Sequence, residues 1–168
     1  MKTIIRTTAF FIMVFTLLCI DAEAQTNFSG RWQFNKAGST PGLMYSEYDG
    51  IVIRQIIQDA DSIKYSDLYL KPGNNDWETG KEAFSLNGKE EIKKGDNYAI
   101  KKLAKWSDDK KSLTLLFIHT QITDNVSADF LNEETYRVSD DGNSLVIETY
   151  SKDPIQGEKR TKSLYNKK

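Results

Sequence analysis

Hydrophobic and polar residues alternate along most of the chain after residue 25, and Gly, Asn and Asp interrupt this alternation at short intervals. A period of two in segments rich in Ile, Val, Thr, Tyr and Phe is typical of strands with one buried face. One helical turn is expected within Thr40–Tyr48, where Pro41 stands near the start. The predicted strands are Phe28–Asn35, Gly50–Gln58, Ser62–Leu70, Lys81–Leu86, Glu90–Lys93, Asn97–Trp106, Ser112–Gln121, Glu133–Val138, Ser144–Tyr150 and Lys159–Tyr165.

The connections between these strands alternate between tight and longer segments. Two tight ones repeat the motif Ser-Asp-Asp-x-x-Ser-Leu, beginning at Ser107 and at Ser139. Because alternate connections of an antiparallel meander lie at the same end, the motif predicts a repeated hairpin turn at one rim. The connections that alternate with the tight ones then gather at the other rim, and all but the third are long: Lys36–Asp49, Lys71–Gly80, Lys94–Asp96, Ile122–Asn132 and Ser151–Glu158.

This succession of neighbouring strands favours one fold class. A sandwich usually needs crossovers between sheets, whereas a meander can close on itself and remove its exposed edges. We therefore expect an all-β, antiparallel up-and-down β-barrel of 8–10 strands, formed by a single domain of residues 25–168.

Residues 1–24 have the pattern of a secretory signal peptide. Lys2 and Arg6 precede the apolar run Ala9–Ile20, and Ala22-Glu23-Ala24 has small residues at the two positions that a signal peptidase reads. The apolar run is too short to span a membrane as a helix. We expect cleavage after Ala24 and a secreted or periplasmic protein, and acylation of Cys19 would instead give a lipid-anchored form.

Composition narrows the class of function. The only cysteine is Cys19, so a mature domain without it excludes disulfides and thiolate metal sites. The 23 basic and 24 acidic residues give a net charge of −1, which does not support nucleic-acid binding. The chain has one histidine and neither a G-x-S-x-G nor an H-E-x-x-H motif. We expect a protein that is not an enzyme, with no cofactor and no metal.

Gly30 and Trp32 form a G-x-W motif in the sequence FSGRWQFN, at the start of the first predicted strand. In this position the motif resembles the lipocalin and fatty-acid-binding (calycin) superfamily, and more closely the secreted bacterial lipocalin-like domain proteins. The resemblance implies a lipocalin-like barrel in which Trp32 plugs the closed end and Arg160 or Lys162 covers it. Fatty-acid binding is not implied, because the last strand lacks the Arg-x-Tyr pair of that family.

The aromatic-rich face of each strand is expected to point inward. In the second strand this face holds Ile53, Gln55 and Ile57. Polar residues on the inner faces stand out, because buried ionisable groups are costly unless they are paired. They are Gln55, Asp67, Lys102, His119 and Glu134. Each either lies solvated near a rim or lines a pocket.

The candidate ligand-binding residues combine inner-face positions with aromatic residues of the long connections. Trp77 lies in the connection Lys71–Gly80, where it either fixes the loop or acts as an aromatic lid. The candidates are Tyr45, Tyr48, Gln55, Tyr65, Trp77, Tyr98, Phe117, His119, Glu134 and Tyr136.

Two functions fit this pattern. In the first, the barrel binds a small hydrophobic or amphipathic ligand that enters between Lys36–Asp49 and Lys71–Gly80. In the second, a filled barrel contacts a protein or glycan partner at the cell envelope through its long-loop rim. The two differ in whether the interior is hollow.

Overall fold

The computed structural model describes residues 25–71, 73, 76–123 and 126–168. The expected signal peptide and the acylation of Cys19 therefore lie outside the described residues. Within the described part of the chain, no helix is long and apolar enough to cross a membrane.

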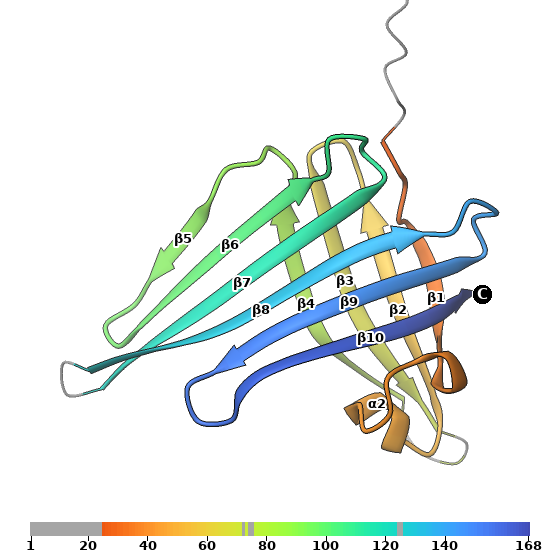
Figure 1. The fold of residues 1–168 in the computed structure, drawn as a ribbon, viewed down its shortest axis with the longest axis horizontal. Coiled ribbons are helices and arrows are strands. Elements are labelled where there is room, and N and C mark those ends of the chain that lie inside the picture. The colour runs from red at the N-terminus through yellow and green to blue at the C-terminus, as the bar shows by residue number, and fades with distance from the viewer. Residues whose placement is uncertain (1–24, 72, 74–75, 124–125) are drawn as a thin grey trace, which may run out of the picture.

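The described chain folds into one ten-stranded antiparallel sheet with the order β4-β3-β2-β1-β10-β9-β8-β7-β6-β5 (Figure 1). The expected all-β, up-and-down architecture is confirmed. A 3-10 turn, η1 (Lys36–Gly38), and a short helix, α2 (Met44–Glu47), lie between the first two strands. The strands are β1 (Gly30–Asn35), β2 (Ile51–Gln58), β3 (Ser62–Leu70), β4 (Trp77–Ser85), β5 (Glu91–Lys94), β6 (Tyr98–Trp106), β7 (Ser112–Thr123), β8 (Val126–Val138), β9 (Ser144–Asp153) and β10 (Gly157–Lys167).

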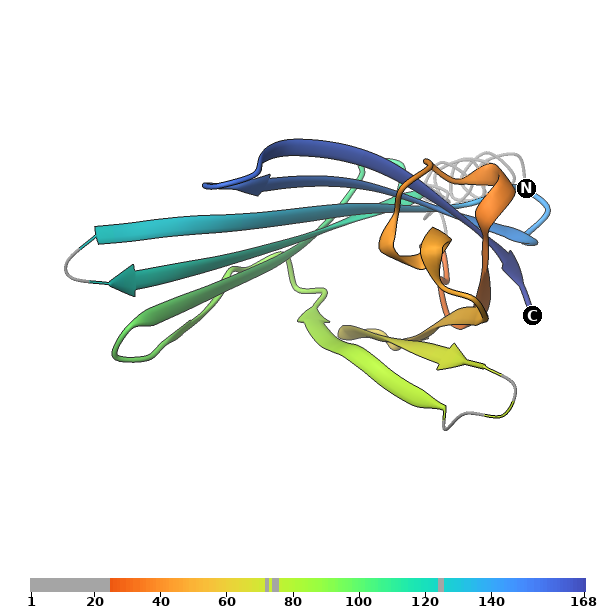
Figure 2. The ribbon, with the colours of Figure 1, turned by 90° about the horizontal axis from the view of Figure 1, so that it is seen from below.

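The sheet curves round on itself into a nearly closed barrel, with β9 and β10 on one side and β2, β3 and β4 on the other (Figure 2). The first and last strands pair with each other, so β4 and β5 form the two edges of the sheet. Lys102 of β6 reaches across to β4, where its ammonium bonds the carboxylate of Glu82 and the carbonyl of Ala83. We call this junction the seam.

The tight turns lie at one rim, as expected, and the other connections lie at the opposite rim (Figure 1). We call them the closed rim and the open rim. The predicted connection Ile122–Asn132 is wrong, because the β7–β8 ladder continues to the pair Thr123 and Val126. Trp77 does not lie in a loop either, since it opens β4 and pairs with Tyr69.

The repeated motif forms the same hairpin turn twice. The Ser107 hydroxyl and the backbone N–H of Lys111 donate to the Asp109 carboxylate, the second over 3.0 Å. In the second copy, Ser139 and Asn143 donate to Asp141 in the same way. The two turns differ in the residue that adopts the left-handed backbone conformation. This residue is Lys110 (φ 55°) in the first turn and Gly142 (φ 71°) in the second.

Trp32 plugs the closed half of the barrel. Its side chain is 1% exposed, lies in one cluster with Phe28 and Tyr136, and donates from Nε1 to the Phe28 carbonyl over 2.9 Å. Gly30 has φ 147°, and a Cβ there would lie 3.5 Å from that indole nitrogen. Only glycine readily adopts such a backbone conformation.

The expected cover of the tryptophan is wrong. Lys167, the register partner of Trp32, places its ammonium 5.4 Å from the centre of the indole. Arg160 pairs with Tyr150 instead, and its guanidinium lies 4.4 Å from the centre of that ring. Lys162 is the register partner of Glu148, so it too lies away from the tryptophan.

The expected inner face of β2 is also wrong. Register partners on neighbouring strands point to the same face of the sheet. Arg54 is the partner of the inward-facing Trp32, and Ile56 is the partner of Tyr65, so the even-numbered residues of β2 face the interior. Ile57 is 56% exposed, and Gln55 is half-buried on the outer face. An arginine therefore occupies the inner position.

Candidate ligand-binding site

Arg54 is the centre of a polar cluster inside the barrel, and the residue is 4% exposed. Its Nε and Nη2 each donate to one oxygen of Asp67 over 2.8 Å. Nη1 donates to Glu134 over 3.1 Å and to the Tyr136 hydroxyl over 3.0 Å. Nη2 also donates to the Tyr45 hydroxyl over 3.3 Å. A guanidinium has five N–H groups, and all five have acceptors here.

The cluster joins opposite sides of the barrel. Asp67 faces Arg54 across the β2–β3 pair, whereas Glu134 and Tyr136 come from β8, and Tyr45 comes from α2. Two further rings flank the guanidinium, with centres 4.7 Å away for Tyr65 and 5.9 Å away for Tyr165. We call Arg54, Asp67, Glu134, Tyr45 and Tyr136 the Arg54 cluster.

The hydroxyls complete the hydrogen-bond network. Tyr45 donates to Asp67 over 2.7 Å, and Tyr136 donates to Glu134. Burial raises the pKa of both tyrosines far above the usual value, so they keep their protons and act as donors. Burial alone would lower the pKa of Arg54, but the surrounding tyrosines, Glu134 and the bond to Asp67 raise it overall. Arg54 therefore stays charged.

A pocket of about 200 Å³ adjoins the cluster. We call it the inner pocket. Side chains of α2, β2, β8, β9 and β10 contribute to its wall, which combines one carboxylate and several hydroxyls with apolar surface. Its lining residues are Leu43, Tyr45, Arg54, Glu134, Ile147, Thr149, Thr161, Ser163 and Tyr165. The pocket can hold one end of a small molecule against charged and polar groups while apolar atoms contact the rest.

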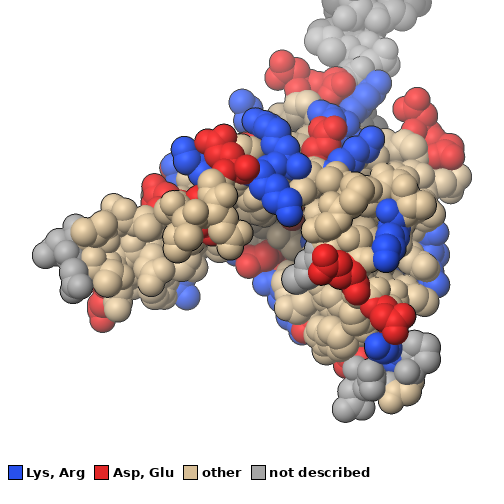
Figure 3. Space-filling model, turned by 60° about the horizontal axis from the view of Figure 1, so that its bottom comes forward, with Lys and Arg blue, Asp and Glu red and all other residues tan. Residues whose placement is uncertain are grey.

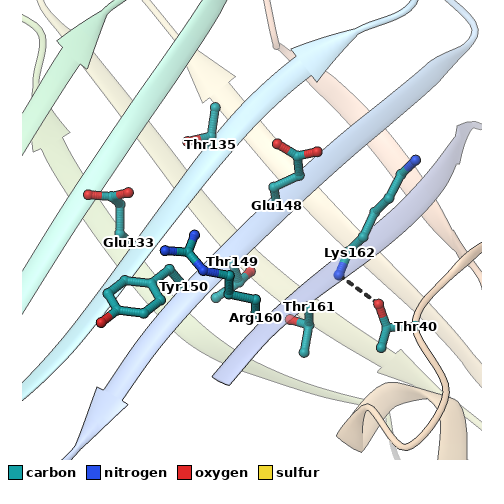
Figure 4. Close-up of a pocket in the computed structure, with 9 residues that line it drawn as sticks. All are labelled: Thr40, Glu133, Thr135, Glu148, Thr149, Tyr150, Arg160, Thr161 and Lys162. Atoms are coloured by element: carbon teal, nitrogen blue, oxygen red, sulfur yellow. Dashed lines mark hydrogen bonds between the residues drawn. The ribbon is translucent and has the colours of Figure 1, made fainter. Parts of the chain in front are cut away.

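A second pocket, of about 450 Å³, lies on the outer side of β8, β9 and β10 (Figure 4). The two pockets share Thr149 and Thr161 as lining residues. The outer pocket holds side chains of both charge signs, and Arg160 covers the ring of Tyr150. Its lining residues are Thr40, Glu133, Thr135, Glu148, Thr149, Tyr150, Arg160, Thr161 and Lys162. The buried network makes the inner pocket the better candidate site.

Four of the predicted ligand-binding residues meet around Arg54: Tyr45, Tyr65, Glu134 and Tyr136. Three others lie on β6 and β7, where the Tyr98 ring lies 6.4 Å from His119 and Phe117 lies 5.8 Å from the Lys102 ammonium. Gln55 lies on the outer face instead. The two remaining candidates, Tyr48 and Trp77, lie in a fourth place, so the predicted residues do not form one site.

Tyr48 and Trp77 belong to an aromatic stack at the open rim. The Trp77 ring lies parallel to Tyr69 at 4.9 Å, and the Tyr48 ring meets Trp77 edge-on at 5.4 Å. Tyr45 contacts the same stack through Tyr69, at 5.9 Å between ring centres. The stack joins the β1–β2 connection to the start of β4, between the two segments where ligand entry is expected.

Arg54 was missed as a site residue, although one signal pointed to it. It is the only charged residue in the run IVIRQIIQ. The tight turn between β2 and β3 sets their register, and this register places Arg54 opposite Asp67. Opposite charges at facing positions of two antiparallel strands are a recognised stabilising pair.

Comparisons with known proteins add little to this geometry. No family model matches the chain, and no curated protein matches it. Among solved structures, the chain is similar to zebrafish ileal bile acid-binding protein complexed with cholic acid, at 17% identity and a TM-score of 0.49. The match covers 84% of this chain and 98% of that one. The fold assignment therefore rests on the strand order and register described above.

Proposed function

We propose that this protein binds a small amphipathic molecule in the inner pocket, with the polar end of the ligand against the Arg54 cluster. The observation that carries the proposal is a buried, fully connected ionic network that lines an open pocket. Buried charges cost free energy even when paired, and strongly perturbed ionisable groups gather at functional sites.

The placement of the pocket supports this proposal. Leu43 and Tyr45 lie in and beside α2, whereas Thr149 and Thr161 form a register pair of β9 and β10. The ligand would therefore enter between α2 and the β9–β10 hairpin. The hydrogen bonds of Arg54 hold the polar wall in place before any ligand arrives, which lowers the entropic cost of binding.

Native mass spectrometry of protein purified from its own host tests the proposal. We expect a bound small molecule that is released on denaturation. Thr161→Phe should abolish this bound mass, because the larger side chain fills the inner pocket. Thr135→Phe is the matched control, since Thr135 lines only the outer pocket and should leave the bound mass unchanged. A bound mass that survives in Thr161→Phe would contradict the proposed site.

We also propose that the protein acts outside the cytoplasm, in the periplasm or beyond. The support is the basic start, the apolar run Ala9–Ile20 and the motif Ala22-Glu23-Ala24. The intact mass of the exported protein should correspond to a chain that begins at Gln25. A diacylglyceryl group on Cys19 would contradict cleavage after Ala24 and indicate a lipid-anchored form.

Figure 3 shows that Lys and Arg are intermixed with Asp and Glu on the side of the molecule that it presents. Together with the net charge of −1, this mixture offers no extended basic surface on that side for a polyanion. The proposal therefore concerns a small molecule and not a nucleic acid.

A further inference from the structure

The Arg54 guanidinium has no donor left for a ligand. Its five N–H groups already donate to Asp67, Glu134, Tyr45 and Tyr136. A carboxylate ligand would have to displace one of these acceptors, two of which are carboxylates: the buried Asp67 and the partly buried Glu134. Arg54 therefore organises the wall of the pocket and does not bind an anion.

Glu134 offers the wall of the pocket an acceptor atom that no donor of the described residues occupies. The hydrogen bonds that the described residues donate to Glu134 both reach Oε2. Oε1 remains for a further donor, and Glu134 lines the inner pocket with its side chain 12% exposed. The hydroxyls of Thr149, Thr161 and Ser163 lie in the same wall and can also accept hydrogen bonds.

The formal charge of the cluster points the same way. The cluster contains one positive charge, on the Arg54 guanidinium, and two negative charges, on the carboxylates of Asp67 and Glu134. Its formal net charge is therefore −1. The nearby basic residues Arg160 and Lys162 line the outer pocket and not the inner one. In a site of low dielectric constant, a second unbalanced negative charge is unfavourable, whereas a positive charge completes a neutral set.

From these three observations we infer that the inner pocket takes the protonated amine of a small amphiphile, held by Glu134. This inference rests on the proposed function and adds the class of ligand to it. The ammonium donates to Glu134 Oε1 and to the neighbouring hydroxyls, while the apolar part contacts Leu43, Ile147 and Tyr165.

A matched set of probes tests the inference. Octylamine, octanoate and octanol each have eight carbons, and at neutral pH their head groups are positively charged, negatively charged and uncharged. In isothermal titration at neutral pH, octylamine should bind at least about tenfold more tightly than octanoate, because like charges within a site cost several kcal/mol. Glu134→Gln removes the charge but keeps an acceptor, so the preference for octylamine should largely disappear.

Glu133→Gln is the control, because Glu133 is the sequence neighbour of Glu134 but lines the outer pocket. It should keep the preference for octylamine. Chemical-shift mapping of the unaltered protein gives a readout that does not depend on the stability of any variant. Octylamine should shift the backbone amides of Ile147, Ser163 and Tyr165, which line the inner pocket and not the outer one.

The possible outcomes distinguish the amine assignment from the proposed binding of a ligand in general. If octanoate or octanol saturates the inner pocket as tightly as octylamine, the amine assignment is overturned while ligand binding stands. If Glu134→Gln keeps the full preference, or if the shifts fall only on outer-pocket residues, Glu134 is not the anchor. If none of the three probes saturates the protein, both the inference and the proposed function are overturned.

Discussion

The two halves of the barrel interior are filled by different chemistry. Near the closed rim, the Phe28 ring stacks on Trp106 and meets Tyr136 edge-on, and Trp32 lies in the same apolar cluster. Toward the open rim, Arg54 and two carboxylates form an ionic network. The change is abrupt, because Trp32 and Arg54 are register partners on neighbouring strands. In the apolar half, each buried side chain adds its own contribution to the free energy of unfolding. In the ionic half, the removal of one charged partner leaves the others unpaired, so the whole network then lowers stability.

Trp32→Ala tests the apolar half and should have the largest effect. Removing this buried side chain leaves a cavity and should lower the free energy of unfolding by about 3–5 kcal/mol. Chemical denaturation measures the loss. Trp77→Ala is the control, because Trp77 is 46% exposed at the open rim and should cost less than about 1.5 kcal/mol. A loss below about 1 kcal/mol for Trp32→Ala would contradict the packing of the closed half.

Arg54→Met tests the ionic half. It leaves the buried Asp67 and the partly buried Glu134 without their guanidinium and should cost about 3 kcal/mol. Replacing Arg54, Asp67 and Glu134 together by Met, Leu and Leu should recover stability to within about 1 kcal/mol of the unaltered protein, because no unpaired charge remains. If the triple variant is as unstable as Arg54→Met, the contrast between the two halves is wrong.

Acid should weaken the repeated turns of the closed rim. Hydrogen bonds from Ser107 and Ser139, together with backbone N–H groups, hold the pKa of Asp109 and Asp141 below the usual value. A carboxyl with a lowered folded-state pKa stabilises the fold above its unfolded pKa, and this contribution is lost as pH falls through the folded value.

The free energy of unfolding measured between neutral pH and about pH 3 gives the test of these turns. Asp109→Asn should remove part of the acid-dependent loss of stability. The neighbouring Asp108→Asn is the control, because Asp109 is the residue that accepts the Ser107 bond. Identical pH profiles for the two variants would contradict a role of the Asp109 hydrogen bonds.

The smallest effect is expected from Lys110→Gly in the same turn. Lys110 has φ 55°, where a side chain is unfavourable, and Gly142 occupies the equivalent position of the second copy. The substitution should raise the free energy of unfolding by about 0.5–1 kcal/mol, because it removes this backbone strain. The reverse change, Gly142→Lys, should lower stability by a similar amount. Equal effects of both changes in one direction would contradict this explanation.

The architecture was predictable because its signals are local. Tight polar turns and a period of two determine the order of the strands and the rim to which each connection belongs. The ends of β7 and β8 were not predictable in this way. Their ladder continues through polar pairs such as Thr120 with Asp129, which show no hydrophobic alternation.

The site was predictable only in part, because its centre depends on register between distant strands. Tyr65, Glu134 and Tyr136 lie on aromatic or polar inner-face positions that the sequence pattern identifies. Arg54 has isoleucine or valine near it on both faces of β2, and Ile53 and Ile56 are both buried. Hydrophobicity alone therefore does not indicate which face of this strand points inward.

The seam has a consequence for how copies of this protein behave at high concentration. An open sheet presents two rows of backbone donors and acceptors, and β4 of one molecule is a template for β5 of the next. Such edge-to-edge pairing of successive copies does not form a closed ring, and it would therefore produce fibres. Three features oppose it: β5 has only four residues, it carries Lys93 and Lys94, and Lys102 binds Glu82 across the gap. The short length of β5 and the charged side chains along the seam should therefore disfavour this pairing.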